Sequence, residues 1–266
     1  MLKLAGLARS TFYYRQKRSS LTSRYAALKE KIKAIFEAHK GRYGYRRVTA
    51  AIRQLGQKVN HKTVQRLMTE MGLKSLVRPK KYRSYKGGAG QVAPDLLQRQ
   101  FTAHGANQKW VTDVTEFHVS GEKLYLSPVM DLFNGEIVAF ETATRPDFKL
   151  VESMVTKALS RLGNNERPIL HSDQGWHYKM PVYQRRLRTH NITQSMSRKG
   201  NCLDNAAMES FFAVLKSEFF YLSRFDTIQS LRDGLSDYIH YYNHHRIKLK
   251  LKGLSPVQYR TQSLLS

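Results

Sequence analysis

The hydrophobic pattern of this chain changes its period once, and that change limits the folds open to it. Between residues 25 and 72, apolar side chains recur every three or four positions, which predicts short amphipathic helices. From residue 110 onward the pattern is that of strands, with helices between the later ones. A basic stretch over 78–90 (RPKKYRSYKGGAG) has neither pattern and marks a boundary. We therefore expect an all-α module followed by an α/β module.

The charge of the chain is divided at the same place. Residues 1–90 hold 23 Lys and Arg against three acidic residues, a net charge of +20, whereas residues 91–266 hold 22 against 17, a net charge of +5. An ordinary solvated surface interleaves both signs. Clustered cations instead suit a polyanion, because Lys and Arg replace the counterions of its phosphates. Nucleic acid is the first candidate; an anionic membrane surface is less favoured, because the basic region has the periodicity of a folded domain.

Several protein classes are excluded by simple features of the sequence. There is no run of about 18 apolar residues for a membrane-spanning helix. The apolar start is broken by Arg9 and is too short for a secretory signal. The single cysteine, Cys202, excludes a disulfide framework and a thiolate-built zinc site. We therefore expect a soluble cytoplasmic protein with no membrane partner.

Three short helices are expected in the N-terminal module. The apolar spacing indicates one helix over residues 25–38 and a second from Val48 to a stop at Gly56. Asn60 can cap a third helix, which ends at Gly72. Two helices joined by a short glycine-containing turn are typical of a helix-turn-helix motif.

The third helix is the candidate for DNA recognition. Its polar residues lie opposite its apolar face, so the helix could enter a major groove. The earlier RYGYRR run could position phosphates or could be a structural turn. The linker and the loop before the last core helix supply further cations. The candidate DNA-binding residues are Tyr43, Arg46, Arg47, His61, Lys62, Gln65, Arg66, Lys80, Lys81, Arg83, Arg198 and Lys199.

The second module alternates strands with helices. Asn134-Gly135 is a strong hairpin signal between two strand-like segments, and Asp147 can cap the helix that follows. The expected order is β-β-β-α-β-α-β-α, an α/β layer with a three-strand meander at its head. The expected segments are strands over 110–119, 124–133, 136–142, 168–172 and 192–196, helices after 147 and over 181–190 and 205–221, and a mostly helical tail over 227–266.

Three carboxylates occur in unusual settings. Asp113 lies in the middle of a strand-like segment, where aspartate is disfavoured, and Asp173 directly follows a buried strand, at the edge where α/β sheets place their sites. Glu209 is on the last core helix, with Lys216 seven residues later on the same face. Such carboxylates can converge to hold hard divalent cations, Mg²⁺ or Mn²⁺. A lone strand aspartate is more often an edge or turn residue, so the pattern by itself leaves both interpretations open.

Other polar residues near this site have simpler explanations. Asp131, beside the hairpin, could be a fourth ligand, but a turn-capping role is favoured. His171, Ser172 and Asp173 superficially resemble a hydrolase triad, but adjacent strand residues point to opposite faces and cannot form one. Lys216 could contact a phosphate or form a salt bridge.

Longer stretches of sequence around the carboxylates carry a family resemblance. WVTDVT contains Asp113, HSDQG contains Asp173, and SMSRKGNCLDNA lies just before Glu209, with 35 residues between the last two carboxylates. GRYGYRR, YYN and LSPVQY add matches near both ends. These words resemble the second-reading-frame (OrfB) transposases of the bacterial insertion sequence 3 family, near the insertion-sequence-150-like subgroup, within the retroviral-integrase superfamily. One departure is His177, where that family more often has glutamine.

The resemblance implies a ribonuclease-H-like (retroviral integrase) α/β core with an N-terminal helix-turn-helix module and a C-terminal helical extension. It implies that Asp113, Asp173 and Glu209 are an acidic catalytic triad, assisted by Lys216. The expected domains are an N-terminal helical fragment at 1–20, a helix-turn-helix-like module at 21–77, a basic linker at 78–100, a catalytic core at 101–222 and a helical extension at 223–266.

The implied activity is metal-dependent DNA cleavage and strand transfer by in-line phosphoryl displacement, with two Mg²⁺ or Mn²⁺ ions. The implied partners are double-stranded DNA at element ends and target, an upstream-frame helix-turn-helix protein joined by ribosomal frameshifting, and further copies of the chain on DNA, in the bacterial nucleoid. A DNA-binding regulator would explain the basic module but not the carboxylates. A nuclease of the ribonuclease-H class would share the core but would cut without joining.

Overall fold

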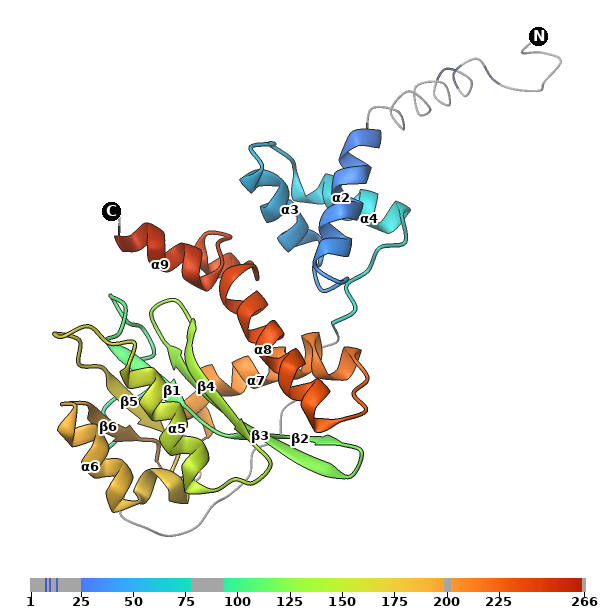
Figure 1. The fold of residues 1–266 in the computed structure, drawn as a ribbon. Helices are drawn as coiled ribbons and strands as arrows, with labels where there is room; N and C mark the ends of the chain where they lie inside the picture. Colours follow the sequence, from blue (N-terminus) through green and yellow to red (C-terminus); the bar gives the residue numbers. More distant parts are fainter. Residues whose placement is uncertain are drawn as a thin grey trace. The chain divides into compact units, whose positions relative to one another are not determined.

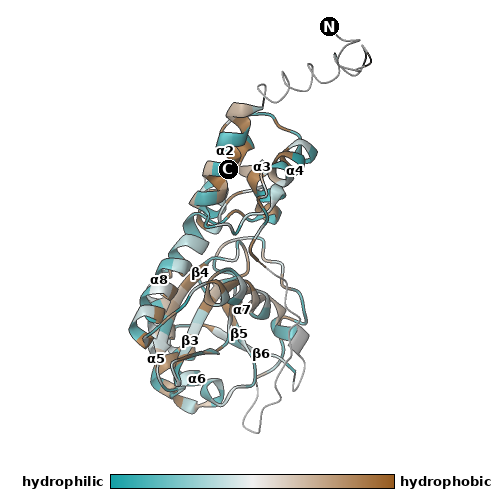
Figure 2. Ribbon diagram, turned by 90° about the vertical axis from the view of Figure 1, so that its right-hand side faces the viewer, coloured by the Kyte–Doolittle hydropathy of each residue, from teal (hydrophilic) through white to brown (hydrophobic). Residues whose placement is uncertain are grey.

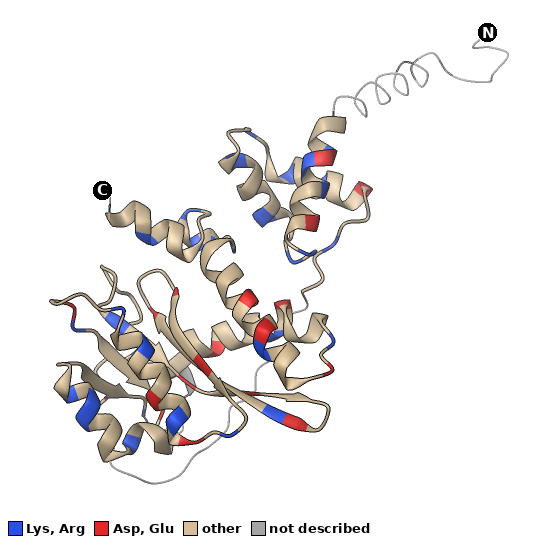
Figure 3. Ribbon diagram, in the orientation of Figure 1, with Lys and Arg blue, Asp and Glu red and all other residues tan. Residues whose placement is uncertain are grey.

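The computed structural model describes residues 8, 10, 13, 25–77, 93–198 and 202–264. The chain divides into two compact units, residues 1–77 and residues 78–266 (Figure 1). Figure 3 shows many basic and few acidic residues in the first unit, as the charge count requires. No helix among the described residues is long and apolar enough to cross a membrane.

Over residues 25–77, the N-terminal unit contains three helices. They are α2 (Ala26–Ala38), α3 (Tyr45–Gln54) and α4 (His61–Glu70). The side chain of Asn60 accepts a hydrogen bond from Lys62 N at 2.9 Å, which confirms it as the cap of α4. Figure 2 shows hydrophilic and hydrophobic residues alternating along these helices. The core of the unit is Leu28, Ile32, Tyr43, Val48, Ile52, Val64, Leu67 and Met68.

The second unit is built on a six-stranded sheet. Strand β3 (Glu122–Asp131) runs antiparallel to β4 (Ile137–Ala143) on one side and to β1 (Lys109–Thr112) and β2 (Thr115–Val119) on the other. Strand β1 continues the sheet in parallel to β5 (Ile169–Ser172), and β5 to β6 (Thr193–Met196).

Helices cover both faces of this sheet (Figure 1). Trp110 packs with α5 (Phe148–Leu159) and α6 (Pro181–Thr189), whereas the next residue, Val111, packs with α7 (Ala206–Glu218) and α8 (Ile228–His244). Adjacent residues of β1 therefore pack into the two hydrophobic cores on opposite faces of the sheet. Short 3₁₀ turns at 176–179, 202–205, 220–222 and 249–251 and helix α9 (Pro256–Leu264) complete the unit.

The expected single strand over 110–119 is interrupted at Asp113, because β1 ends at Thr112 and β2 begins at Thr115. The prediction that Asp113 lies in the middle of a strand is therefore wrong. Thr112 pairs with Val129 and Thr115 with Leu126, so one register runs through the gap and sets Asp113 opposite Pro128. Proline has no N–H for the ladder. The Pro128 carbonyl instead accepts from Thr112 Oγ1 at 2.9 Å.

Two segments expected to be peripheral belong to the core. Residues 93–100, expected as linker, lie along β6: Met196 N donates to Pro94 O at 3.2 Å, and Leu97 is buried. Helix α8, expected in a separate extension, also supplies core residues. The Asn243 side chain at its end pairs with both backbone groups of Ile137 at 2.9 Å, as a neighbouring strand would.

Candidate active site

The sheet register places two of the predicted carboxylates beside each other. Parallel strands β1 and β5 pair Val111 with His171, and the same register two residues further on sets Asp113 beside Asp173. Neighbouring strands lie about 4.8 Å apart. Burial raises the pKa of Asp113 well above its ordinary value, and the charges of Asp173 and Glu209 raise it further.

Local backbone N–H groups orient both aspartates. Asp113 Oδ1 accepts from Val114 N at 2.7 Å, and Asp173 Oδ1 accepts from Gly175 N at 2.8 Å. Burial raises the pKa of Asp173, while the Gly175 bond and the charge of His177 oppose that rise. Within the described part of the chain, the Oδ2 atom of each aspartate accepts no hydrogen bond. Each carboxylate therefore retains a free oxygen.

The third carboxylate, Glu209, is brought to the sheet by the start of α7. The Nδ2 atom of Asn205, at the helix N-cap position, donates to Thr112 O at 3.2 Å and ties the helix to the end of β1. Glu209 follows in the first turn, and burial raises its pKa. Over residues 25–77, 93–198 and 202–264, no three His, Cys, Asp or Glu side chains are grouped closely enough to hold a metal ion as they stand. Glu209 therefore influences Asp113 electrostatically without closing a cluster.

The other candidates near this site have separate partners. Lys216 Nζ lies over the Phe117 ring, 5.2 Å from its centroid, and burial lowers the pKa of this amine. Among the described residues, the carboxylate whose charge acts on Lys216 is Glu116 and not Glu209. Asp131 accepts from Asn107 N at 2.8 Å and Phe133 N at 3.0 Å, which is the expected turn-capping role.

Sequence reasoning missed the groups that fix the loop before α7. Buried Asp204 accepts from Arg198 at 2.9 and 3.0 Å and from Arg99 at 3.0 Å, and these bonds hold the pKa of Asp204 well below its usual range. Arg198, predicted to bind DNA, is therefore engaged in an internal ion pair. An acidic residue within a basic stretch was the only signal available. Sequence reasoning rejected His171 as part of a hydrolase triad but gave it no other role; its Nδ1 lies 2.8 Å from Ser195 Oγ and links β5 to β6.

Of the four DNA-binding candidates on the predicted recognition helix, three are exposed to solvent without an internal ion pair among the described residues: His61, Lys62 and Gln65. Arg66 is exposed but forms an ion pair with Glu70 at 3.3 Å and lies over the Tyr25 ring.

The RYGYRR run is partly structural. The prediction that Tyr43 contacts DNA is wrong, because its side chain is 0% exposed and stacks on His39 with ring centroids 3.8 Å apart. Arg46 is exposed, whereas Arg47 is half-buried and lies over the Tyr43 ring. The remaining DNA-binding candidates, Lys80, Lys81, Arg83 and Lys199, lie outside the described residues.

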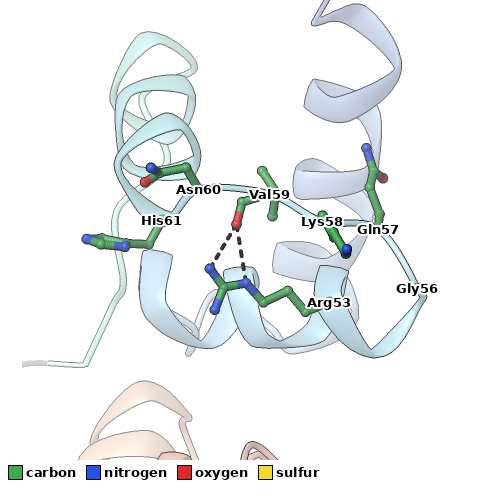
Figure 4. A pocket seen from close by; sticks show the side chains of 7 residues that line it. All are labelled: Arg53, Gly56, Gln57, Lys58, Val59, Asn60 and His61. Atoms are coloured by element: carbon green, nitrogen blue, oxygen red, sulfur yellow. Dashed lines mark hydrogen bonds between the residues drawn. The ribbon is translucent and has the colours of Figure 1, made fainter.

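A hollow of about 740 Å³ opens at the turn between α3 and α4 (Figure 4). Arg53 donates to Val59 O at 3.2 and 2.9 Å and closes the turn behind it. Its lining includes two cationic side chains and three other polar ones alongside apolar surface; the lining residues are Arg53, Gly56, Gln57, Lys58, Val59, Asn60 and His61.

Three protein-family models match this chain. The model of an integrase core domain matches residues 103–202, a second integrase core model matches 209–264, and an HTH-like domain matches 24–81. The putative transposase InsK for insertion sequence element IS150 of Escherichia coli K12 is 53% identical over 265 residues, covering 100% of this chain and 94% of that protein.

Two further proteins are similar. An uncharacterized transposase-like protein of Haemophilus influenzae is 57% identical over 207 residues, covering 78% of this chain and 95% of its own length. The HTLV-2 integrase catalytic core domain, solved in complex with magnesium, is 16% identical with a TM-score of 0.47, covering 59% of this chain and 98% of that one.

The fold and the matched models define an integrase-core DNA transposase with a helix-turn-helix-like region. The chain belongs to the insertion sequence 3 family of transposases, in its IS150-like group. The predicted fold class and enzyme class are therefore confirmed.

Proposed function

We propose that Asp113, Asp173 and Glu209 are the acidic triad of this transposase. The observation that carries the proposal is the β1–β5 register, which sets the two aspartates side by side at the carboxyl ends of parallel strands. Burial, together with the charges of Asp173 and Glu209, raises the pKa of Asp113, which supports the proposal. Carboxylates with such perturbed pKa values are common at functional sites.

The donor set fits Mg²⁺ or Mn²⁺. Each aspartate keeps one oxygen clear of internal hydrogen bonds, and hard oxygen donors suit these ions rather than zinc or copper. Asp113, Asp173 and Glu209 would hold two ions. When bound, such ions make a water or a DNA 3′-hydroxyl a better nucleophile and stabilise the leaving 3′-oxygen.

Residues around the triad position the carboxylates and the DNA. The N–H groups of Val114 and Gly175 each bond one oxygen of an aspartate, which leaves the other oxygen of each carboxylate available to a metal ion. An in-line displacement needs no covalent enzyme intermediate. Lys216 lies beside Phe117, four residues beyond Asp113 along the sheet, and would contact a neighbouring phosphate of the same DNA strand.

The basic N-terminal unit would supply most of the DNA affinity. His61, Lys62 and Gln65 present polar groups from α4, and Arg46 adds a cation before it. The basic hollow at the α3–α4 turn suits a backbone phosphate. Double-stranded DNA, both at the element ends and at the target, is the proposed partner.

The triad is tested by Asp113→Asn, Asp173→Asn and Glu209→Gln, with exposed Asp226→Asn as the matched control. Each triad variant should lose cleavage and strand transfer of oligonucleotide ends by at least a hundredfold while gel-shift affinity is unchanged. Asp113→Asn should also raise the free energy of unfolding in the absence of metal, because it removes a carboxylate whose pKa is raised in the folded protein. Near-normal joining by any one variant removes that residue from the site.

We also propose that the chain works as part of a larger assembly on DNA in the bacterial nucleoid. The family resemblance supports a frameshift fusion to an upstream-frame helix-turn-helix protein, and several copies of the chain at paired element ends. Fusion should raise end-specific strand transfer over that of the 266-residue chain. Equal end specificity with and without the upstream product would contradict the fusion.

A further inference from the structure

The two tryptophans of this chain have opposite surroundings. Trp110 is 1% exposed in the core, whereas Trp176 is 53% exposed. Burying a large apolar ring stabilises a fold, and an exposed indole loses that contribution. An exposed tryptophan therefore suggests a function other than packing. Trp176 lies at the start of the 3₁₀ turn Trp176–Lys179, three residues after Asp173.

The indole is held by a rigid support. Its ring stacks on His177 with centroids 3.9 Å apart and an interplanar angle of 29°. His177 is buried, and its Nε2 atom lies 2.8 Å from Pro146 O. One face of the indole is therefore covered by a fixed ring.

The turn also fixes the indole relative to the carboxylate. Gly175 N donates to Asp173 Oδ1, and a Cβ atom at position 175 would lie 2.9 Å from that oxygen and 3.2 Å from the Tyr178 ring. Only glycine allows so close an approach. Only two residues separate Trp176 from Asp173 of the proposed triad, and the tight turn between them fixes the position of the indole relative to that carboxylate.

An open aromatic face near a DNA-processing site matches a nucleobase. Base–aromatic stacking is tolerant of sequence, because every base has a π face. Paired bases in a duplex already stack on each other, so only an unpaired or extruded base offers a free face. Exposed Arg145, next to the Pro146 that anchors His177, adds a cation for the adjoining phosphate.

We propose that Trp176 is a stacking platform for an unpaired nucleobase of the DNA strand being processed beside Asp173. The inference rests on the proposed function of the Asp113–Asp173 site and deepens it. By holding one base out of the duplex, Trp176 acts as a positioning residue that keeps the adjoining phosphate at the carboxylates.

The first test is fluorescence, because the other tryptophan is buried. Adding a single-stranded oligonucleotide to the full chain carrying Asp113→Asn, which is inert in the proposal, should quench the emission of Trp176 and leave that of Trp110. Trp176→Leu should abolish the quenching. Unchanged emission at saturating DNA would overturn the inference.

The second test is strand transfer on two substrates. With fully paired DNA ends, Trp176→Leu should lower the rate about tenfold or more, the effect of losing one base stack, and Trp176→Phe should restore most of it. With ends already frayed by mismatches, the loss should be much smaller. The control is Tyr221→Leu, at an equally exposed aromatic (52%), which should change neither rate.

The two proposals fail in different ways. Equal rates for Trp176→Leu and wild type on paired ends, with the triad variants inactive, overturn only the stacking role. An equal loss on paired and frayed ends shows a general structural defect and also overturns it. Active triad variants overturn the catalytic assignment itself.

Discussion

Replacing Asp204 tests whether the loop entering α7 is held by charge. The buried carboxylate accepts four hydrogen bonds, three from Arg198 and one from Arg99, at 2.9 to 3.1 Å. Asp204→Asn keeps the size of the side chain but leaves Arg99 without this counter-charge and Arg198 with only Asp95, at 3.9 Å. Because Asn205 and Glu209 follow directly, we expect lower stability and weaker positioning of the third carboxylate.

The loss of stability expected for Asp204→Asn depends on how exposed its two arginine partners are. Removing one member of a buried ion pair costs about 3–5 kcal/mol. Here Asp204 is buried, but the side chains of Arg198 and Arg99 are 57% and 45% exposed, so solvent screens part of the charge. We therefore expect Asp204→Asn to lower the free energy of unfolding by about 2–3 kcal/mol at pH 7.

The stabilisation by Asp204 depends on pH. The arginine bonds hold the folded-state pKa of Asp204 below its unfolded value of about 4. The stabilisation is therefore complete above about pH 4 and is lost as the pH falls through the folded-state pKa. The stability gap between wild type and variant should be constant from pH 5 to 8 and should narrow below pH 4.

Urea unfolding at several pH values measures that gap, with exposed Asp226→Asn as the control for the chemical change. Strand transfer by Asp204→Asn should fall while DNA binding persists. A gap below about 0.5 kcal/mol at pH 7, or a gap that widens in acid, would refute the reasoning.

Two further predictions concern the C-terminal segment. Arg246 donates to Glu218 at 2.7 and 2.8 Å with both side chains buried, so Arg246→Met should cost about 3–5 kcal/mol in urea unfolding. Arg161 is half-exposed and its buried partner, Glu136, keeps Arg260 at 3.2 Å, so Arg161→Gln should cost less than about 1 kcal/mol, and equal costs would contradict the argument. Burial and the charge of Arg246 lower the pKa of Lys248 to about 7. Unfolding then binds a proton, so wild-type stability should rise between about pH 7 and pH 10 and Lys248→Met should remove that rise; an identical pH profile for both proteins would contradict it.

Local signals in the sequence predicted most elements of the fold. The periodicity of the three N-terminal helices, the Asn134-Gly135 hairpin and the capping of α5 by Asp147, which accepts from Leu150 N at 3.2 Å, all depend on neighbours within a few residues. Each is decided by backbone geometry and short-range hydrogen bonds. Such features depend little on tertiary contacts and are therefore predictable from the sequence.

Features that depend on distant partners were not predictable. Tyr43 is as well suited to a phosphate as to a core, and its burial depends on how three helices pack. Arg198 looks like a free cation until the fold brings Asp204 and Arg99 to it. The same holds for α8, whose Asn243 completes the edge of β4 from 106 positions away.

The interruption at Asp113 links a local signal to the proposed chemistry. Pro128 was visible within a predicted strand, and a proline there implies a break in the neighbouring ladder. What the sequence lacked was the register that sets this proline opposite Asp113. With the ladder broken, Val114 N is free to bond the Asp113 carboxylate, which turns that side chain to the strand end instead of leaving it in the strand. The residue least suited to a strand therefore lies where the strand is not continuous, and the neighbouring parallel strand ends at Ser172, directly before Asp173.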